Sequence, residues 1–228
     1  MEGSVSEARR AAKELEDVGF LKMRGQDWTP FFAVIKHFEN LPSPDRQVVF
    51  LSALRRMVIV AGSDEFERLS GFILRTLRHP SGKIRQAAVA TGLELIYVLE
   101  LAQFVMGKTE FTAVQERRVK RDRRRFMDFF VALENLRDGA CDPRLEKFEY
   151  IEEMPPSVCK SAEMLIFELM SDPICERVIE AHKRGYLESL PLISSDSIFE
   201  TDSVAGNGLE APAWLDCTWR RLGCQKKE

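Results

Sequence analysis

The sequence lacks the motifs by which many enzymes are recognised. It contains no glycine-rich nucleotide-binding loop and no Gly-x-Ser-x-Gly nucleophile motif. Its three histidines, His37, His79 and His182, do not have the spacing of metal ligands, and we expect structural roles for them. The sequence therefore predicts no catalytic residue, no metal site and no cofactor, and it favours a function other than catalysis.

Two further absences concern disulfides and membrane segments. The five cysteines are an odd number and include no Cys-x-x-Cys pair, which argues against a disulfide framework or a zinc site. We expect free thiols in a reducing cytoplasm. No apolar signal core follows Met1, and Glu94 and Glu100 interrupt the most apolar long stretch, residues 87–106. We expect no membrane association, and these glutamates either line the edge of a buried helix or pair with arginines of a neighbouring one.

Strand-like alternation of apolar and polar residues is also missing, whereas apolar residues recur every three or four positions. The pattern predicts an all-α fold, with helices separated by short proline- or glycine-containing breaks. The expected helices cover residues 4–18, 29–41, 45–61, 64–79, 81–106, 109–138, 157–170 and 173–184. One continuous apolar seam should include Val48, Leu54, Leu77 and Leu93.

An internal repeat relates two of these helices. At an offset of 39 residues, Arg46 maps onto Arg85 and Leu54 maps onto Leu93. The two Pro-Ser linkers that precede these helices match at an offset of 38. A period near 40 residues with two helices per unit is typical of HEAT-type solenoids.

The segment 77–88 resembles the HEAT consensus, in which a turn is followed by an apolar residue, a basic residue and two small residues. The matching residues are Ile84, Arg85, Ala87 and Ala88. His79 stands where the family usually has the aspartate that bridges the turn, so the resemblance does not extend to this bridging role. The resemblance covers residues 29–99 and implies an α-α superhelix of stacked helical hairpins that exposes an extended surface to a protein or peptide partner.

Beyond Gly107 the repeat fades, and we expect a less regular helical part up to residue 184. Residues 185–228 are acidic and carry too little apolar surface to fold alone, so they are expected to form a flexible, partly disordered tail. The sequence thus predicts a helical domain at 1–184 and a tail at 185–228. A docking element for another protein is expected in the tail at Trp214, Leu215 and Trp219.

The main charged feature is a basic run at residues 117–125. It holds seven basic residues and one acidic residue, although the whole chain has a net charge of −3. The candidate binding residues are Arg117, Arg118, Lys120, Arg121, Arg123, Arg124 and Arg125. These side chains either contact a partner or nucleic-acid phosphates, or form a solvated helix face paired with nearby acids.

Residues 185–219 contain six acidic residues and no lysine or arginine. This balance suggests that the tail folds back over the basic run, although an independent acidic tail fits the composition equally. The sequence as a whole predicts a non-catalytic helical-repeat scaffold or adaptor that binds a protein or peptide. The alternative is a nucleic-acid-associated protein that contacts the phosphate backbone through residues 117–125.

Overall fold

The computed structural model of the chain describes residues 28–58, 61–102, 112–140 and 156–191, together with Ser6, Arg9 and Arg10. Within these ranges the protein is all-α, as expected, and contains no strand. Most of the first expected helix, 4–18, lies outside the described residues. The elements are α2 (Thr29–Lys36), η1 (Phe38–Asn40), α3 (Pro44–Met57), α4 (Phe66–Thr76), α5 (Gly82–Ile96), α6 (Ala113–Ala140), α7 (Val158–Ser171), α8 (Pro173–Lys183) and η3 (Leu187–Ser189).

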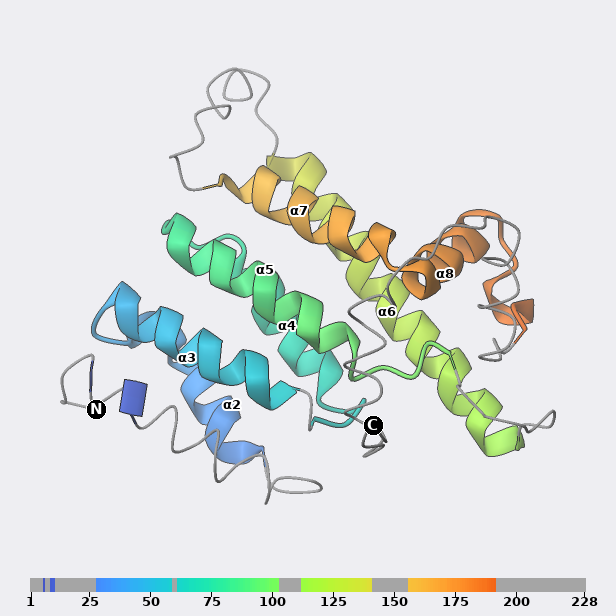
Figure 1. Cartoon of the computed structure of the whole chain (residues 1–228), viewed down its shortest axis with the longest axis horizontal. Helices are drawn as coiled ribbons and strands as arrows, with labels where there is room; N and C mark the ends of the chain where they lie inside the picture. Colours follow the sequence, from blue (N-terminus) through green and yellow to red (C-terminus); the bar gives the residue numbers. More distant parts are fainter. Residues whose placement is uncertain are drawn as a thin grey trace, which may run out of the picture.

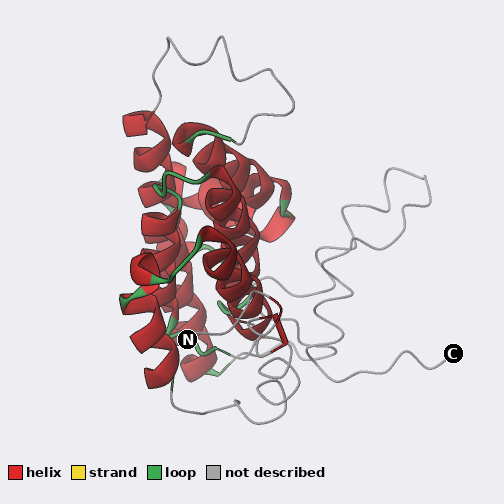
Figure 2. Cartoon of the chain, turned by 90° about the vertical axis from the view of Figure 1, so that its left-hand side faces the viewer, coloured by secondary structure: helices red, strands yellow, loops and turns green. Residues whose placement is uncertain are grey.

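The helices lie in two layers. In one layer α3, α5 and α7 run side by side, with α5 in contact with both neighbours (Figure 1). Behind them α4 packs against α6 and α5, and Arg68 of α4 covers the ring of Phe32 in α2. The side view in Figure 2 shows the two layers edge-on. The last helix, α8, packs against α7 and α6, and η3 contacts α8.

Local sequence explains where several helices begin. The Ser43 hydroxyl accepts a hydrogen bond from the Arg46 N–H at 3.4 Å, and the Ser157 hydroxyl accepts one from the Lys160 N–H at 3.0 Å. The Asp172 carboxylate accepts bonds from two N–H groups of the first turn of α8, both at 2.9 Å. These side chains satisfy backbone donors that have no partner within the helix.

The apolar seam joins the two layers into one core. Leu54 and Leu77 are buried, while Val48 and Leu93 are half-buried and pack against the core, which confirms the expected seam. Aromatic rings pack against one another in this core. The rings of Phe38 and Phe72 meet edge to face at 5.1 Å, and those of Phe66 and Phe129 do so at 5.9 Å. Such pairs add to the free energy that burial itself supplies.

Gly92 lies where α5 packs closely against both α4 and α7. A Cβ atom there would meet Leu165 Cδ2 at 2.9 Å and Ile73 Cγ2 at 3.2 Å. We expect Gly92→Ala to lower the free energy of unfolding by about 1–2 kcal/mol, because the overlap exceeds the gain in helix propensity. The matched control is Gly71→Ala in α4, where a Cβ meets no atom within 4 Å and should stabilise by about 0.5–1 kcal/mol. Urea denaturation of both variants tests this, and equal shifts would contradict it.

The turn between α4 and α5 is bridged by His79. Its Nδ1 accepts a hydrogen bond from the Ser81 N–H at 3.0 Å, and its Nε2 lies 3.4 Å from the Glu39 carboxylate. Because Nδ1 is an acceptor, the neutral ring carries its proton on Nε2, facing Glu39. The imidazole of His79 therefore bridges the turn, because it supplies the acceptor.

Two boundaries differ from the sequence predictions. Helix α5 ends at Ile96, well before residue 106, and residues 103–106 lie outside the described part of the chain. Residues 185–191, which the sequence assigns to the tail, include η3, and η3 contacts α8. In both places the backbone is bound by side chains of α6.

Gly185 turns the chain back at the end of α8. Its φ is +76°, a left-handed conformation that glycine adopts without a steric penalty. The Tyr186 N–H donates to the Ala181 carbonyl and the Gly185 N–H donates to the His182 carbonyl, both at 3.0 Å. This is the Schellman arrangement, and it directs the following residues towards α6.

Candidate binding surfaces on α6 and α7

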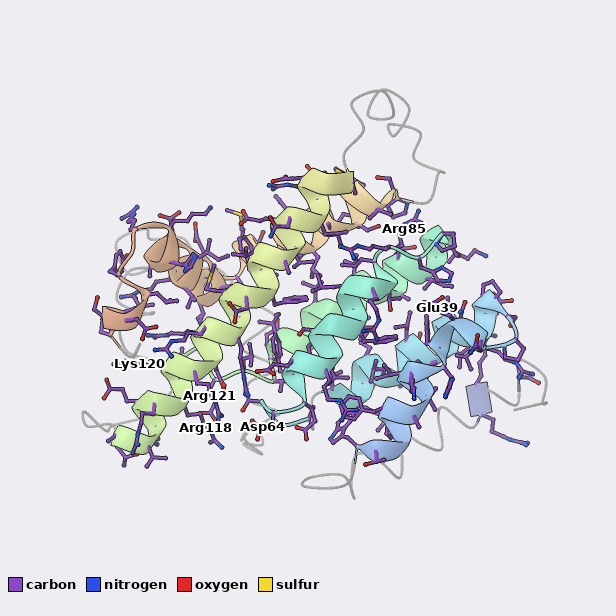
Figure 3. All side chains as sticks on the ribbon, turned by 180° about the vertical axis from the view of Figure 1, so that it is seen from behind. Glu39, Asp64, Arg85, Arg118, Lys120 and Arg121 are labelled. Atoms are coloured by element: carbon purple, nitrogen blue, oxygen red, sulfur yellow. The ribbon has the colours of Figure 1, made fainter. Side chains whose placement is uncertain are left out.

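The basic run lies in the N-terminal half of α6, where its side chains project in several directions. Figure 3 shows Arg118, Lys120 and Arg121 on this part of the helix, with Asp64 close to Arg121. Two charged members of the run differ sharply from the other charged residues, because Asp122 and Arg123 have 0% exposure, as does the apolar Val119. The run therefore combines a surface with a buried structural pair.

Arg123 is buried without a carboxylate among its hydrogen-bond partners. Its Nε donates to the Leu101 carbonyl at 3.1 Å, its Nη1 to the Leu190 carbonyl at 2.7 Å and its Nη2 to the Pro191 carbonyl at 3.0 Å. Burial, with a smaller effect from the positive charge of Arg177, lowers the pKa of Arg123 to about 10. The guanidinium remains protonated at neutral pH, and it ties two distant segments to α6.

Asp122 binds the backbone beside one of these segments. Its Oδ2 accepts a hydrogen bond from the Glu100 N–H at 3.1 Å. Burial raises the pKa of the Asp122 carboxyl, while this bond and the charges of Arg121 and Arg125 act in the opposite direction. Asp122 and Arg123 together hold the chain that follows α5, which accounts for the early end of that helix.

Three exposed cations of the run pair with glutamates. Arg118 Nη1 lies 3.0 Å from Glu100 Oε1, so this glutamate, which lies beyond the end of α5, pairs with an arginine of a neighbouring helix, as one of the two interpretations expected. The ammonium of Lys120 lies 2.7 Å from the Glu116 carboxylate, one helical turn away. Arg124 binds the carboxylate of Glu188. Glu94 behaves similarly, since Arg55 of α3 binds it at 2.9 Å.

Arg121 and Arg125 join α6 to the loop that precedes α4. Arg121 Nη2 donates to the Ser63 hydroxyl at 2.9 Å, and Arg125 Nη1 donates to the Ser63 carbonyl at 2.6 Å. Arg125 also lies 3.2 Å from both Asp64 and Glu67. These contacts fix the loop against α6, and they occupy many of the N–H donors of the two guanidinium groups.

The structure separates the seven predicted binding residues into three kinds. Arg123 cannot reach a partner in this fold, so its assignment to a binding surface is corrected to a structural role. Five others have acidic partners from the fold, which agrees with the interpretation of a paired helix face. Arg117 is exposed and donates only to the Ala113 carbonyl among the contacts described. Trp214, Leu215 and Trp219 lie outside the described residues.

A second surface, on α7, was not predicted. Met164, Phe167 and Met170 form a row on the outer side of the helix, with exposures of 36%, 68% and 40%. The signal was present in the sequence, because six of the seven residues at 164–170 are apolar. A helix cannot bury such a run on one face, so some of these side chains must face solvent.

One of the cysteines differs from the expectation that all of them are free thiols. Cys175 is a free, buried thiol, and burial raises its pKa well above the usual value. Cys159 is disulfide-bonded, and its partner lies outside the described residues. This bond does not fit the expectation of free thiols in a reducing compartment.

No helix in the described part of the chain is both long and apolar enough to cross a membrane. The same residues contain no group of three or more metal-ligating side chains. No family model, curated protein or solved structure matches the chain. Function must therefore be inferred from the surfaces on α6 and α7.

Proposed function

We propose that this protein is a non-catalytic helical scaffold that binds a segment of another protein, and that its hairpins stack in a HEAT-like manner. The pairs α4/α5 and α6/α7 each place one helix in each layer and pack together, which supports the second part of the proposal. The resemblance of residues 77–88 to the repeat consensus gives further support.

The exposed row on α7 carries the functional proposal. Three large apolar side chains at a spacing of three residues offer a continuous surface to a partner, and methionine adapts readily to different shapes. Glu163 and Glu168 are exposed beside the row; Glu163 is paired with Lys160 at 2.8 Å, whereas Glu168 has no basic partner among the described contacts. The acids disfavour a second copy of this chain, and they favour a partner segment with apolar residues and basic flanks.

The alternative, binding to the nucleic-acid backbone, receives less support. Affinity for a phosphate backbone depends on several cations that are free to release counterions. Most cations of residues 117–125 instead contact acids or carbonyls of the fold. We therefore place the partner on α7 and treat nucleic acid as the competing outcome.

Phe167→Asp should abolish binding of a fluorescent helical peptide that carries leucines at i and i+4 with lysine flanks. Phe167 is the most exposed member of the row, so an aspartate there should remove the contact with little effect on folding. The matched control is Val114→Asp at the start of α6, because Val114 has the same 68% exposure but lies outside the row. Fluorescence anisotropy measures both.

A version of the peptide with glutamate flanks should bind more weakly than the lysine version. Equal loss of binding in the Phe167 and Val114 variants would contradict the assignment of the site to α7. Binding of duplex DNA or RNA that is stronger than peptide binding and collapses with salt would favour the alternative function.

A further inference from the structure

Glu188 of η3 forms an ion pair with Arg124, an exposed arginine of the basic run. Its two carboxylate oxygens accept hydrogen bonds from Arg124 Nε at 2.6 Å and from Arg124 Nη2 at 2.8 Å. Both side chains are more than half exposed. This bidentate geometry, with two parallel N–H···O bonds, is the usual one by which arginine binds a carboxylate. The Arg124 side chain therefore has a conformation suited to binding a carboxylate.

Contacts on both sides of Glu188 in the chain fix its position beside Arg124. The turn at Gly185 reverses the chain after α8, and Arg123 then holds the carbonyls of Leu190 and Pro191. Glu188 therefore lies between two fixed points, and its carboxylate has a high effective concentration at Arg124. An external carboxylate must compete with this internal one.

Other cations lie around the same position. Lys120 is close enough to help lower the pKa of Glu188, although Arg124 is the main cause. Arg177 of α8 is exposed on the other side and acts electrostatically on Arg123. Lys120 is itself paired with Glu116 at 2.7 Å, so four cations at the junction of α6 and α8 (Lys120, Arg123, Arg124 and Arg177) are accompanied by two paired carboxylates, Glu188 and Glu116. An acidic ligand at Lys120 would compete with Glu116 as well.

We propose that Arg124 and Lys120 form a binding site for an acidic peptide segment, and that Glu188 is a built-in competitor for that site. An acidic peptide fits better than nucleic acid, because one arginine fork and one lysine match a carboxylate or two, whereas a phosphate backbone needs a longer row of free cations. Exposed ion pairs are weak, so removal of the Glu188 charge should raise affinity by about fivefold. This site is separate from the row on α7 and does not depend on it.

The test compares Glu188→Gln with the wild-type chain in binding a fluorescein-labelled hexaglutamate peptide at low salt. Glu188→Gln should bind about fivefold more tightly, and the double variant Arg124→Gln/Glu188→Gln should lose the gain. The matched control is Glu180→Gln, which removes the same charge from an exposed pair with Arg184 on α8 and should leave binding unchanged. Thermal unfolding by circular dichroism confirms that each variant is folded.

Three results would overturn the proposal. The first is no gain for Glu188→Gln in a folded protein. The second is a gain that persists in the double variant, because it would then not depend on Arg124. The third is a larger gain for a single-stranded oligonucleotide of equal charge than for the peptide, which would assign the surface to nucleic acid. The first two outcomes leave the proposal for α7 unaffected, whereas the third supports the competing function of nucleic-acid binding.

Discussion

Replacing Arg123 by methionine should lower the free energy of unfolding by about 3 kcal/mol. The substitution leaves the carbonyls of Leu101, Leu190 and Pro191 without their donor, and an unsatisfied buried acceptor costs about 1–3 kcal/mol. Removal of a desolvated charge offsets part of this cost. The melting temperature should fall by roughly 10 °C, measured by circular dichroism or calorimetry.

The neighbouring residue provides the control. Arg124→Met makes the same chemical change one position along α6, but its ion pair with Glu188 is exposed and should contribute less than about 1 kcal/mol. Arg123→Lys should fall between the two, because one ammonium cannot reach all three carbonyls. Similar losses for Arg123→Met and Arg124→Met would show that the buried hydrogen bonds of Arg123 do not carry the stability assigned to them.

Replacing Arg85 by methionine should lower the free energy of unfolding by about 2–3 kcal/mol. Arg85 is buried at the start of α5, where Nη1 donates to the carbonyls of His79 at 2.5 Å and Pro80 at 2.9 Å. Its Nε donates to the Pro156 carbonyl at 2.9 Å, and Nη2 donates to the same oxygen. The substitution therefore releases both the turn before α5 and the segment that enters α7.

The control for Arg85 lies two residues earlier. Lys83→Met changes an exposed cation in the same first turn of α5, and its effect should stay within about 0.5 kcal/mol. Urea denaturation should show a lower midpoint for Arg85→Met with an unchanged slope, as expected when stability alone changes. A midpoint for Arg85→Met equal to that of Lys83→Met would reject the role of Arg85 as a link between turns.

The sequence predicted the helices and their order well, because each helix carries its own periodicity and many carry a capping residue. It could not identify which arginine of residues 117–125 is buried. All seven cations have similar local surroundings, and the burial of Arg123 depends on carbonyls 22 and 67 residues away in the chain. Long-range partners of this kind leave no local pattern.

The end of α5 shows the same limitation. Residues 97–102 continue the apolar pattern of α5, so the sequence favours a longer helix. In the fold, the Glu100 N–H and the Leu101 carbonyl bind Asp122 and Arg123 in place of helical partners. The exposed row on α7 could have been predicted, since the run at 164–170 is too apolar for a single buried face.

The hydrogen bonds from Arg123 to Leu190 and Pro191 also bear on how far the chain can be shortened. A polypeptide cut after Arg184, where helical periodicity ends, would leave the buried, charged guanidinium of Arg123 without two of its hydrogen-bond acceptors. A cut after Pro191 keeps both carbonyls in place. The smallest autonomous folding unit of this protein at its C-terminal side therefore extends past the last helix.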